Sequence, residues 1–264
     1  MQFLPKKCIP ILIDRDSIEI YNGDKINLIM NGWYQITKGN RFISSNISPI
    51  YSSIHINNPN KIDSFVINNL KKYEPIGCRD IYTLNILQKF RIKSYFSSCL
   101  TTTLDIDYMI NESERSNEII FIDYNFGYNK QIDNYIKSLK AYNFHKVSYT
   151  SHYFNMKLSQ FERFKLAKSL LDKYARAKLI ITTRLHGALP CLALNTPFIF
   201  VNREYDVRYD GLYELINHVG INSTGKFDIN VLLNKNKLVI NPKKYLKYSN
   251  QLKKKLLNIT NLNY

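Results

Sequence analysis

The chain has 264 residues, of which 45% are hydrophobic, enough for the cores of two ordinary domains or one large one. Its 37 Lys and Arg residues against 21 Asp and Glu residues give a formal net charge of +16. This charge favours an anionic partner: a nucleic acid, an acidic membrane leaflet or a phosphorylated small molecule. Because the sequence has neither zinc-finger spacing nor an RNP-like aromatic motif, we expect no nucleic acid partner.

The four cysteines lie far apart and form no C-x-x-C pair; they are Cys8, Cys78, Cys99 and Cys191. This spacing favours reduced thiols over a disulfide framework or a zinc site. The apolar run 8–13 is too short for a signal peptide, and no stretch approaches the roughly 20 apolar residues needed to span a bilayer. We therefore expect a cytoplasmic protein whose only membrane contact is peripheral, at the inner face.

The first half of the chain alternates apolar runs with helical patterns. Strands are expected at 26–30, 50–56, 75–78 and 94–96, and helices at 62–72 and 81–90. The stretch 109–117 is polar and lacks periodicity, which predicts a domain junction there. The sequence thus predicts an N-terminal α/β domain over residues 1–112.

The second half shows the same alternation more clearly. Strands are expected at 118–122, 146–150, 179–184 and 197–201, and helices at 130–140, from the capping box Ser159–Glu162 onward, and at 187–194. The helix after Ser159 is expected to bury Phe161, Phe164, Leu171 and Tyr174. The alternation predicts a parallel sheet with right-handed crossovers, a Rossmann-like domain over residues 113–240.

The tail, residues 241–264, contains a basic amphipathic helix over 242–257. Tyr245, Tyr248, Leu252 and Leu256 share one face of it. Such a helix packs its apolar stripe on the parent domain or lies on an anionic membrane surface, and the sequence leaves both placements open.

One strand-to-helix junction places Arg184 and His186 where an α/β protein handles anions. The helix start offers unpaired amides and the positive end of its dipole, which favour a phosphate or a carboxylate. A buried histidine satisfied by its neighbours is the plain alternative for His186. An arginine two residues earlier argues against it, because Arg does not enter a core without an anionic partner.

Three further places carry chemistry-bearing residues. Arg79 and Asp80 follow the strand 75–78; Asp80 suits a helix N-cap, whereas Arg79 calls for an anionic partner. The turn 96–105 is rich in hydroxyls that suit phosphate oxygens or an ordinary surface loop. His152 follows the strand 146–150, and strand ends of one parallel sheet share a crevice, so His152 and His186 are expected to lie together.

These residues carry a resemblance to a known family. The segment 177–197, centred on Thr183-Arg184-Leu185-His186-Gly187, resembles the signature of the polysaccharide pyruvyl transferase family. The segment 75–104, with Gly-Cys-Arg-Asp and Ser-Cys-Leu-Thr, is also similar to that family. So are Asn31-Gly-Trp33, His152 and Arg208-Tyr-Asp-Gly-Leu.

The resemblance implies two Rossmann-like domains in a GT-B-like arrangement, with parallel sheets flanked by helices. It also implies phosphoenolpyruvate as donor substrate, with no cofactor, and a glycan or lipid-linked oligosaccharide as acceptor. The donor contacts it implies or favours are Arg79, Arg184, Leu185, His186, Gly187, Ser98, Thr101 and His152. Acceptor contacts are expected at Asn31, Trp33, Asp80 and Arg208.

Arg184 and His186 are the catalytic candidates. The ordinary pKa of histidine lies near neutrality, which suits acid/base work, but His186 can equally donate a hydrogen bond to phosphate without transferring a proton. Asp80 and Asp105 are candidates for a partner acid or base. No carboxylate cluster has metal-ligand spacing, so we expect a metal-independent reaction.

Two other functions stay open at this point. A glycosyltransferase would hold the diphosphate of a nucleotide sugar at the same helix start. A non-catalytic glycan-binding or nucleic-acid-binding protein would use the same fold and its positive charge, and its affinity would fall steeply with salt.

Overall fold

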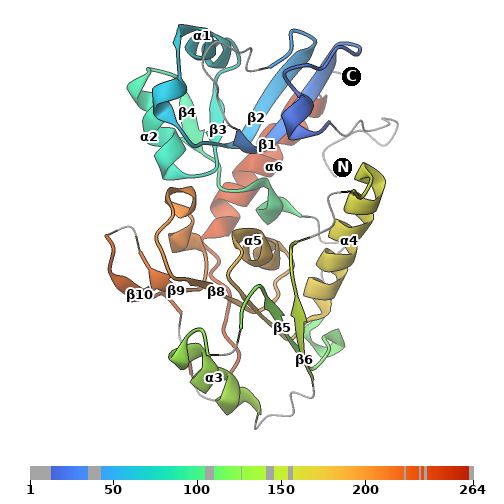
Figure 1. Ribbon diagram of the computed structural model, residues 1–264, viewed down its shortest axis with the longest axis vertical. Helices are drawn as coiled ribbons and strands as arrows, with labels where there is room; N and C mark the ends of the chain where they lie inside the picture. The colour runs from blue at the N-terminus through green and yellow to red at the C-terminus, as the bar shows by residue number, and fades with distance from the viewer. Residues whose placement is uncertain are drawn as a thin grey trace. The chain divides into compact units, whose positions relative to one another are not determined.

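The computed structural model describes residues 13–34, 43–104, 110–125, 127–140, 146–153, 157–222, 224–231, 233–234 and 237–261. The chain divides into two compact units, one of residues 1–103 with 246–264 and one of residues 104–245. The helix near the carboxyl end therefore belongs to the first unit, and the second unit is one continuous segment. Each unit contains its own sheet (Figure 1).

The first unit is built on a four-stranded parallel sheet in the order β1-β2-β3-β4. Its strands are β1 (Ile26–Tyr34), β2 (Ile47–Ile56), β3 (Ile76–Cys78) and β4 (Ser94–Phe96). Its helices are α1 (Ser64–Lys72), α2 (Ile81–Lys89) and α6 (Tyr245–Asn261), with α6 beginning at the boundary between the units. Short 3₁₀ helices lie at Arg15–Ser17, Pro59–Lys61 and Leu100–Thr103.

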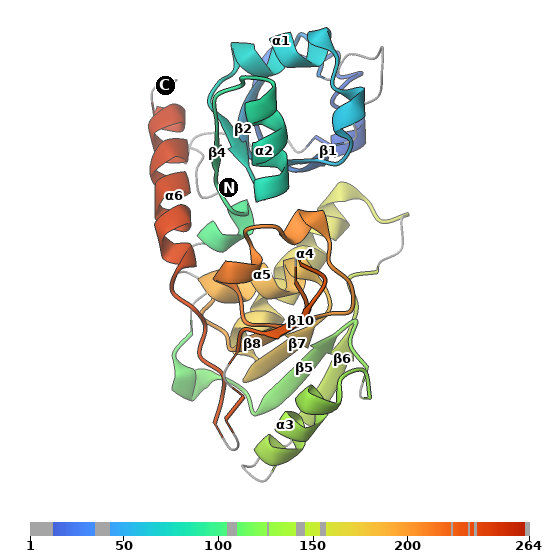
Figure 2. The same ribbon diagram turned by 90° about the vertical axis from the view of Figure 1, so that its left-hand side faces the viewer.

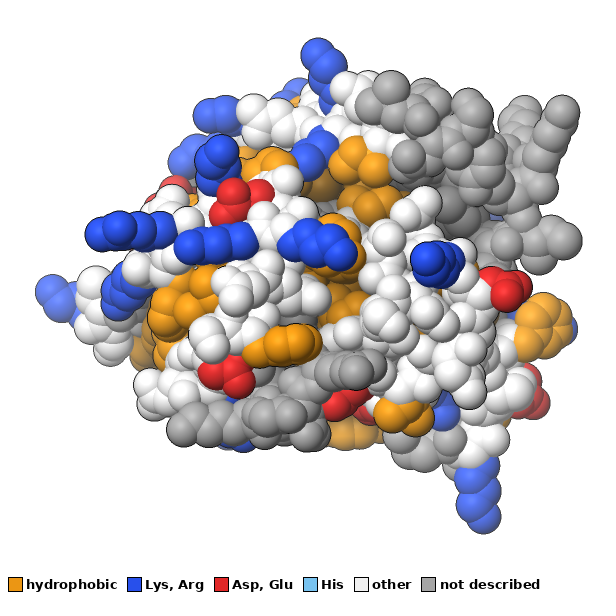
Figure 3. Space-filling view, turned by 90° about the horizontal axis from the view of Figure 1, so that it is seen from above, with side chains coloured by type: hydrophobic (Ala, Val, Ile, Leu, Met, Phe, Trp, Pro, Cys, Tyr) orange, Lys and Arg blue, Asp and Glu red, His pale blue; other side chains and the backbone are white. Residues whose placement is uncertain are grey.

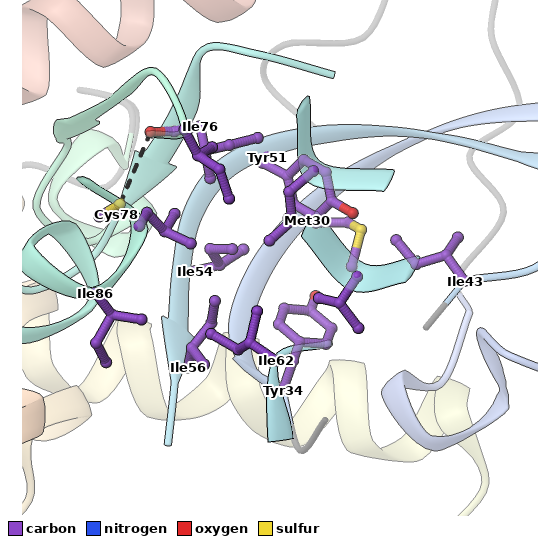
Figure 4. Packing of buried hydrophobic residues seen from close by; sticks show 14 of the residues in the cluster. Met30, Tyr34, Ile43, Tyr51, Ile54, Ile56, Ile62, Ile76, Cys78 and Ile86 are labelled. Atoms are coloured by element: carbon purple, nitrogen blue, oxygen red, sulfur yellow. Dashed lines mark hydrogen bonds between the residues drawn. The ribbon is translucent and has the colours of Figure 1, made fainter. Parts of the chain in front are cut away.

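Helices cover both faces of this sheet. Apolar side chains of β1, β2 and β3 meet those of α1 and α2, among them Val66 and Leu87, in one cluster. Figure 4 shows Met30, Ile54 and Ile76 of the strands within it. Local signals set the helix starts, because the side chains of Asp63 and Asp80 cap the first turns of α1 and α2. Burial on both faces explains why the strands read as apolar runs rather than as alternating patterns.

The tail helix α6 packs on the other face of the same sheet (Figure 2). Leu252 and Leu256 are buried against Ile29, Ile50 and Leu100. Further contacts fix the helix: the Tyr248 ring meets the Phe96 ring edge-on, Ser249 Oγ donates to Thr102 O at 3.0 Å, and Lys255 Nζ lies 3.9 Å from the Tyr95 ring centroid. Burial lowers the pKa of Lys255 to about 8. The apolar stripe of α6 is therefore covered within the protein.

The second unit is built on a six-stranded sheet in the order β10-β9-β8-β7-β5-β6, parallel except for β10. Its strands are β5 (Glu118–Ile122), β6 (Lys146–Thr150), β7 (Leu179–Thr182), β8 (Phe198–Asn202), β9 (His218–Ile221) and β10 (Phe227–Ile229). Its helices are α3 (Lys130–Lys140), α4 (Gln160–Arg176) and α5 (Leu185–Ala193). Short 3₁₀ helices lie at Glu112–Glu114, Val207–Tyr209 and Tyr213–Leu215.

Alternating residues of this sheet are buried on opposite faces. Phe121 and Ile181 share a cluster with Ile132 and Ile136 of α3. Their neighbours along the strands are also fully buried, as at Ile180. Figure 2 shows α3 on one side of this sheet and α4 and α5 on the other. Each unit is thus a parallel-dominated sheet flanked by helices, consistent with the Rossmann-like, GT-B-like fold class expected from the sequence.

The prediction that Phe161 and Phe164 lie in the core was wrong. They are 65% and 41% exposed, whereas Tyr174, on the same helix, is 2% exposed. The predicted capping box at Ser159 is present, so the start of α4 is not the cause. At about 100° per residue, Phe161 lies about 140° and Phe164 about 80° around the helix from Tyr174. Both rings therefore fall outside a buried stripe that is centred in the last turn.

Gly77 in β3 tests how tightly the first sheet is packed. A Cβ atom at this position would lie 2.3 Å from the backbone oxygen of Ser52 on the neighbouring strand. We expect Gly77→Ala to lower the free energy of unfolding by about 1–3 kcal/mol in urea titrations, because backbone must move. The exposed control Lys89→Ala should change it by less than about 0.5 kcal/mol. Equal effects of the two substitutions would contradict the close approach.

Candidate functional site

Polar side chains gather where three adjacent strands of the second unit end. Asp123 follows β5, Ser151 and His152 follow β6, and Arg184 follows β7. Because β5 pairs with both β6 and β7, Asp123 stands between the other two strand ends. Carboxyl ends of neighbouring parallel strands are the usual place for a ligand site in a sheet of this kind.

The carboxylate of Asp123 ties these strand ends together. It accepts hydrogen bonds from Ser151 Oγ, from the His152 backbone amide at 3.4 Å and from Arg184 Nε at 2.7 Å. Its backbone has a φ of 50°, a left-handed conformation that is uncommon outside glycine. Burial raises the pKa of Asp123, but the hydrogen bonds from Ser151 and Arg184 outweigh burial, so the pKa lies below its ordinary value.

Arg184 occupies the N-cap position of α5, between strand and helix. Its backbone amide donates to Thr182 Oγ1 at 2.9 Å, and its guanidinium carbon lies 4.7 Å from the centroid of the Tyr153 ring. Hydrogen bonds to Asp123 and Tyr153 raise the pKa of Arg184, so it stays charged. The side chain is 39% exposed. A guanidinium has five N–H donors, more than these two partners use.

The residues after Arg184 set how closely α5 approaches its strand. A Cβ atom on Gly187 would lie 2.6 Å from Thr182 Oγ1, so only glycine fits without displacement. Leu185 is 7% exposed and anchors the first turn, while His186 lies exposed on the same turn. The helix start therefore sits directly on the strand end, with an arginine and a histidine beside its first amides.

His152 lies close enough to this group for the charges to interact. Its Nε2 lies 2.7 Å from the Tyr174 hydroxyl, and its ring stacks on the Tyr174 ring. Burial lowers the pKa of His152; Asp123 opposes this effect, while His186 and Arg184 add to it. The lowered pKa favours the neutral form of His152, so the charged side chains beside it are the paired Asp123 and Arg184.

Arg208 lies beyond the next strand, β8, in the same unit. Its guanidinium binds Asp206 through two nitrogens, with Nε 2.8 Å from Oδ2. The hydrogen bond to Asp206 is the main effect on the pKa of Arg208 and raises it. The positive charge of Arg184 acts in the opposite direction and lowers this pKa. Arg208 is thus held in a local ion pair, close enough to Arg184 for the two charges to interact.

The first unit contains a second, buried polar group. Asp80 is 0% and Arg79 3% exposed, both directly after β3. Asp80 accepts from the Thr83 amide at 2.8 Å and pairs with Nδ1 of His55 at 2.7 Å. Arg79 Nε lies 3.8 Å from the same carboxylate, and among the described residues it has no hydrogen-bond partner. An arginine buried in this way suits an anionic ligand.

His55 was not singled out from the sequence. It lies in β2, is 1% exposed and stands opposite Trp33 in the β1–β2 register. Its only sequence signal is a histidine within an apolar strand, which is more often a satisfied core residue than a functional one. Asn31 and Trp33 are half-buried in β1, and Asn31 Oδ1 lies 3.9 Å from Cys99 Sγ.

The hydroxyl-rich turn after β4 is bound into the first unit. Ser98 is buried with a φ of 58°, and its backbone oxygen accepts from Ser53 Oγ. Thr101 Oγ1 donates to Cys99 Sγ at 3.2 Å. Asp105, expected as an alternative acid or base, lies outside the described residues.

The structure therefore distributes the predicted site residues over both units. Asn31, Trp33, Arg79, Asp80, Ser98 and Thr101 lie in the first unit, and His152, Arg184, Leu185, His186, Gly187 and Arg208 lie in the second. The sequence analysis did not single out Asp123. The pattern that could have indicated it is a lone carboxylate directly after the buried strand 118–122.

Comparison with known protein families identifies the group to which the chain belongs. The family model described as polysaccharide pyruvyl transferase matches residues 5–205. The chain belongs to the polysaccharide pyruvyl transferase family. No curated protein and no solved structure matches it. The matched part of this pyruvyl transferase family member runs from before β1 to just beyond β8, and so includes Arg79, Asp123 and Arg184.

Two further features of the described residues bear on partners. In the part of this pyruvyl transferase family member that the structure describes, no three or more His, Cys, Asp or Glu side chains form a group able to hold a metal ion. Over the same residues, no helix has the length and hydropathy needed to cross a membrane.

Asp123→Asn tests whether this carboxylate holds the site together. We expect a loss of about 1–3 kcal/mol in the free energy of unfolding at neutral pH, because an ionised acceptor for three donors is removed. The pKa of Asp123 is depressed, so its contribution is complete above the ordinary value of 3.8 and is lost as pH falls through the folded value. Urea midpoints of the two proteins should therefore converge on acidification.

The matched control for this substitution is Asp172→Asn, at an exposed position of α4. It removes the same charge from the same unit and should leave stability within about 0.5 kcal/mol of the parent protein. A gap between Asp123→Asn and the parent that stays constant as the pH falls would contradict the role given to the Asp123 carboxylate.

Proposed function

We propose that this protein transfers pyruvate from phosphoenolpyruvate to two hydroxyls of one sugar, forming a ketal and releasing phosphate. The sugar belongs to a cell-surface polysaccharide or its lipid-linked precursor. The observation that carries the proposal is the Asp123–Arg184 pair at the start of α5, in a member of the polysaccharide pyruvyl transferase family. We propose that the reaction takes place in the cytoplasm, at the inner face of the membrane if the acceptor is lipid-linked.

The anchored arginine suits the donor. Phosphoenolpyruvate carries a carboxylate and a phosphate, and a guanidinium binds either through parallel N–H groups. Asp123 fixes Nε, so the ligand need not order the side chain, and the α5 amides add a positive dipole end. We propose that Leu185, His186 and Gly187 place those amides, and that His152 completes the anion site as a neutral hydrogen-bonding group.

Residues of the first unit are proposed as further contacts. The buried guanidinium of Arg79, with Nε lacking a hydrogen-bond partner among the described residues, supports a second anion contact for the donor. Ser98 and Thr101 are proposed as further donor contacts, because their hydroxyls can bind phosphate oxygens. For the acceptor we propose Asn31, Trp33 and Arg208. We also propose Asp80, whose carboxylate binds the Thr83 amide of α2 and His55 Nδ1 within the protein.

The reaction can be followed atom by atom. A proton adds to the methylene carbon of the donor, which leaves C2 as an oxocarbenium-like electrophile. One sugar hydroxyl adds to C2 and loses its proton; the C2–O bond to phosphate then breaks, and the second hydroxyl closes the ketal as its proton leaves. Of the two protons that the hydroxyls release, one replaces the proton taken up by the methylene carbon and the other goes to the departing phosphate. One diol and one phosphoenolpyruvate thus give one ketal and one phosphate, with no redox change. Cationic donors of Arg184 stabilise the departing phosphate.

His186 is our candidate for the proton transfers. It is exposed on the first turn of α5, next to Arg184, and an imidazole can both donate and accept a proton. The step needs no metal, because protonation activates C2 and Arg184 offsets the phosphate charge. We therefore propose a metal-independent reaction.

Donor binding by Arg184 can be measured without turnover. We expect phosphoenolpyruvate to raise the thermal midpoint of the parent protein, and Arg184→Ala to weaken donor affinity at least about tenfold, because charge-assisted hydrogen bonds are lost. The control Arg176→Ala removes an exposed arginine from the end of α4 and should keep the donor response. Stabilisation by a nucleotide sugar but not by phosphoenolpyruvate would favour a glycosyltransferase and overturn the proposal.

The role of His186 is tested by kinetics. If His186 transfers protons, His186→Ala should lower kcat at least about a hundredfold while leaving the donor affinity within a few-fold of the parent value. The acidic or basic limb of the pH profile should disappear with it. An equal loss of donor affinity and of turnover would show that His186 binds phosphate and does not act as acid or base.

A further inference from the structure

The first turns of α4 present an unusual combination of side chains to solvent. Phe161, Phe164, Lys165 and Lys168 follow the spacing i, i+3, i+4 and i+7, which places them on one face of the helix. All four are exposed, the two rings by 65% and 41%. Lys165 Nζ lies 4.5 Å from the centroid of the Phe161 ring. We call these four residues the α4 face.

The α4 face is not the side that the helix uses for folding. Tyr174 and Ala175 are buried in the last turn, and the Tyr174 hydroxyl contacts His152 Nε2 as described above. The rings of Phe161 and Phe164 lie to the side and back of that stripe. Two neighbouring exposed aromatic rings on a regular helix mark an interaction surface more often than isolated apolar residues do.

The charge of the α4 face is wholly positive. Glu162, the acidic residue nearest to it in sequence, is bound by Ser159 in the capping box, and these hydrogen bonds lower its pKa. Positive side chains also dominate elsewhere: the view in Figure 3 shows many Lys and Arg side chains, interspersed with hydrophobic ones, and few acidic ones. The α4 face therefore favours a partner that is both anionic and apolar.

We propose that the α4 face docks the protein on an anionic lipid bilayer. Phenylalanine rings enter the boundary between headgroups and acyl chains, and lysines beside them bind lipid phosphates. A polynucleotide also matches the charge, but the sequence has neither the zinc-finger spacing nor the RNP-like aromatic motif of a nucleic-acid-binding protein. A second copy would bring Lys165 and Lys168 against like charges. The apolar stripe of α6 is not available, because Leu252 and Leu256 are buried in the first unit.

Docking through α4 also orients the candidate site. Parallel strands deliver their helices from the carboxyl edge of the sheet, so α4 begins at the edge where β6 ends and Arg184 lies. Only residues 151–159 separate the end of β6 from the first residue of α4. An acceptor held on a lipid carrier would approach from this edge. The docking itself does not depend on the proposed transfer reaction, and it is tested without substrate.

The experiment is co-sedimentation of the full chain with vesicles. We expect binding to vesicles of equimolar phosphatidylcholine and phosphatidylglycerol, and much weaker binding to phosphatidylcholine alone. Phe161→Ser with Phe164→Ser should reduce binding at least about tenfold, because both rings lose apolar burial. Lys165→Glu with Lys168→Glu should do the same through charge. The control Lys243→Glu with Lys244→Glu makes an identical charge change at exposed positions and should bind far better than the α4 charge variant.

Three results would overturn the proposal. One is vesicle binding that the serine pair leaves unchanged. Another is a serine pair that lowers the thermal midpoint by several degrees, because the rings would then be covered by the protein itself. The third is a parent protein that sediments as a dimer while the serine pair sediments as a monomer, which would make the α4 face a contact between copies. An unchanged midpoint and mass together with lost vesicle binding would support it.

Discussion

One carboxylate sets the geometry of the second unit's site. Asp123 joins the ends of β5, β6 and β7 through bonds to Ser151, His152 and Arg184. Without it, a half-exposed arginine would sample many rotamers, and a ligand would have to order them at an entropic cost. Because Asp123 fixes Nε, the Arg184 guanidinium stays in one position beside the first turn of α5. Gly187 allows α5 to pack closely against β7.

The first unit handles its charges in a different way. His55, Asp80 and Arg79 are almost fully buried. The Asp80 carboxylate pairs with His55 Nδ1 and accepts a hydrogen bond from a backbone amide in the first turn of α2. Such a group is stable only if its hydrogen bonds are made. Arg79 Nε makes none within the described residues, and the Arg79 side chain is buried whereas that of Arg184 is 39% exposed, so solvent reaches the two guanidinium charges to different extents.

Much of this arrangement could be predicted from the sequence, and the exceptions share a physical cause. The strand 118–122, the helix 130–140 and the capping box at Ser159 were predicted at the positions observed, because local periodicity and capping encode them. Asp123 and His55 were missed because their partners lie far away in the chain. Phe161 and Phe164 were misassigned because an apolar spacing does not reveal which side of a helix meets the sheet. β9 and β10 carry too short a pattern to stand out.

We propose that Arg184, held by Asp123, receives the donor. A crystal structure of the protein with phosphoenolpyruvate tests it most directly. We predict that the carboxylate or phosphate binds the terminal nitrogens of Arg184 and the first amides of α5, while Nε stays on Asp123. Donor density remote from Arg184, or an arginine that leaves Asp123 to bind the donor, would contradict the claim.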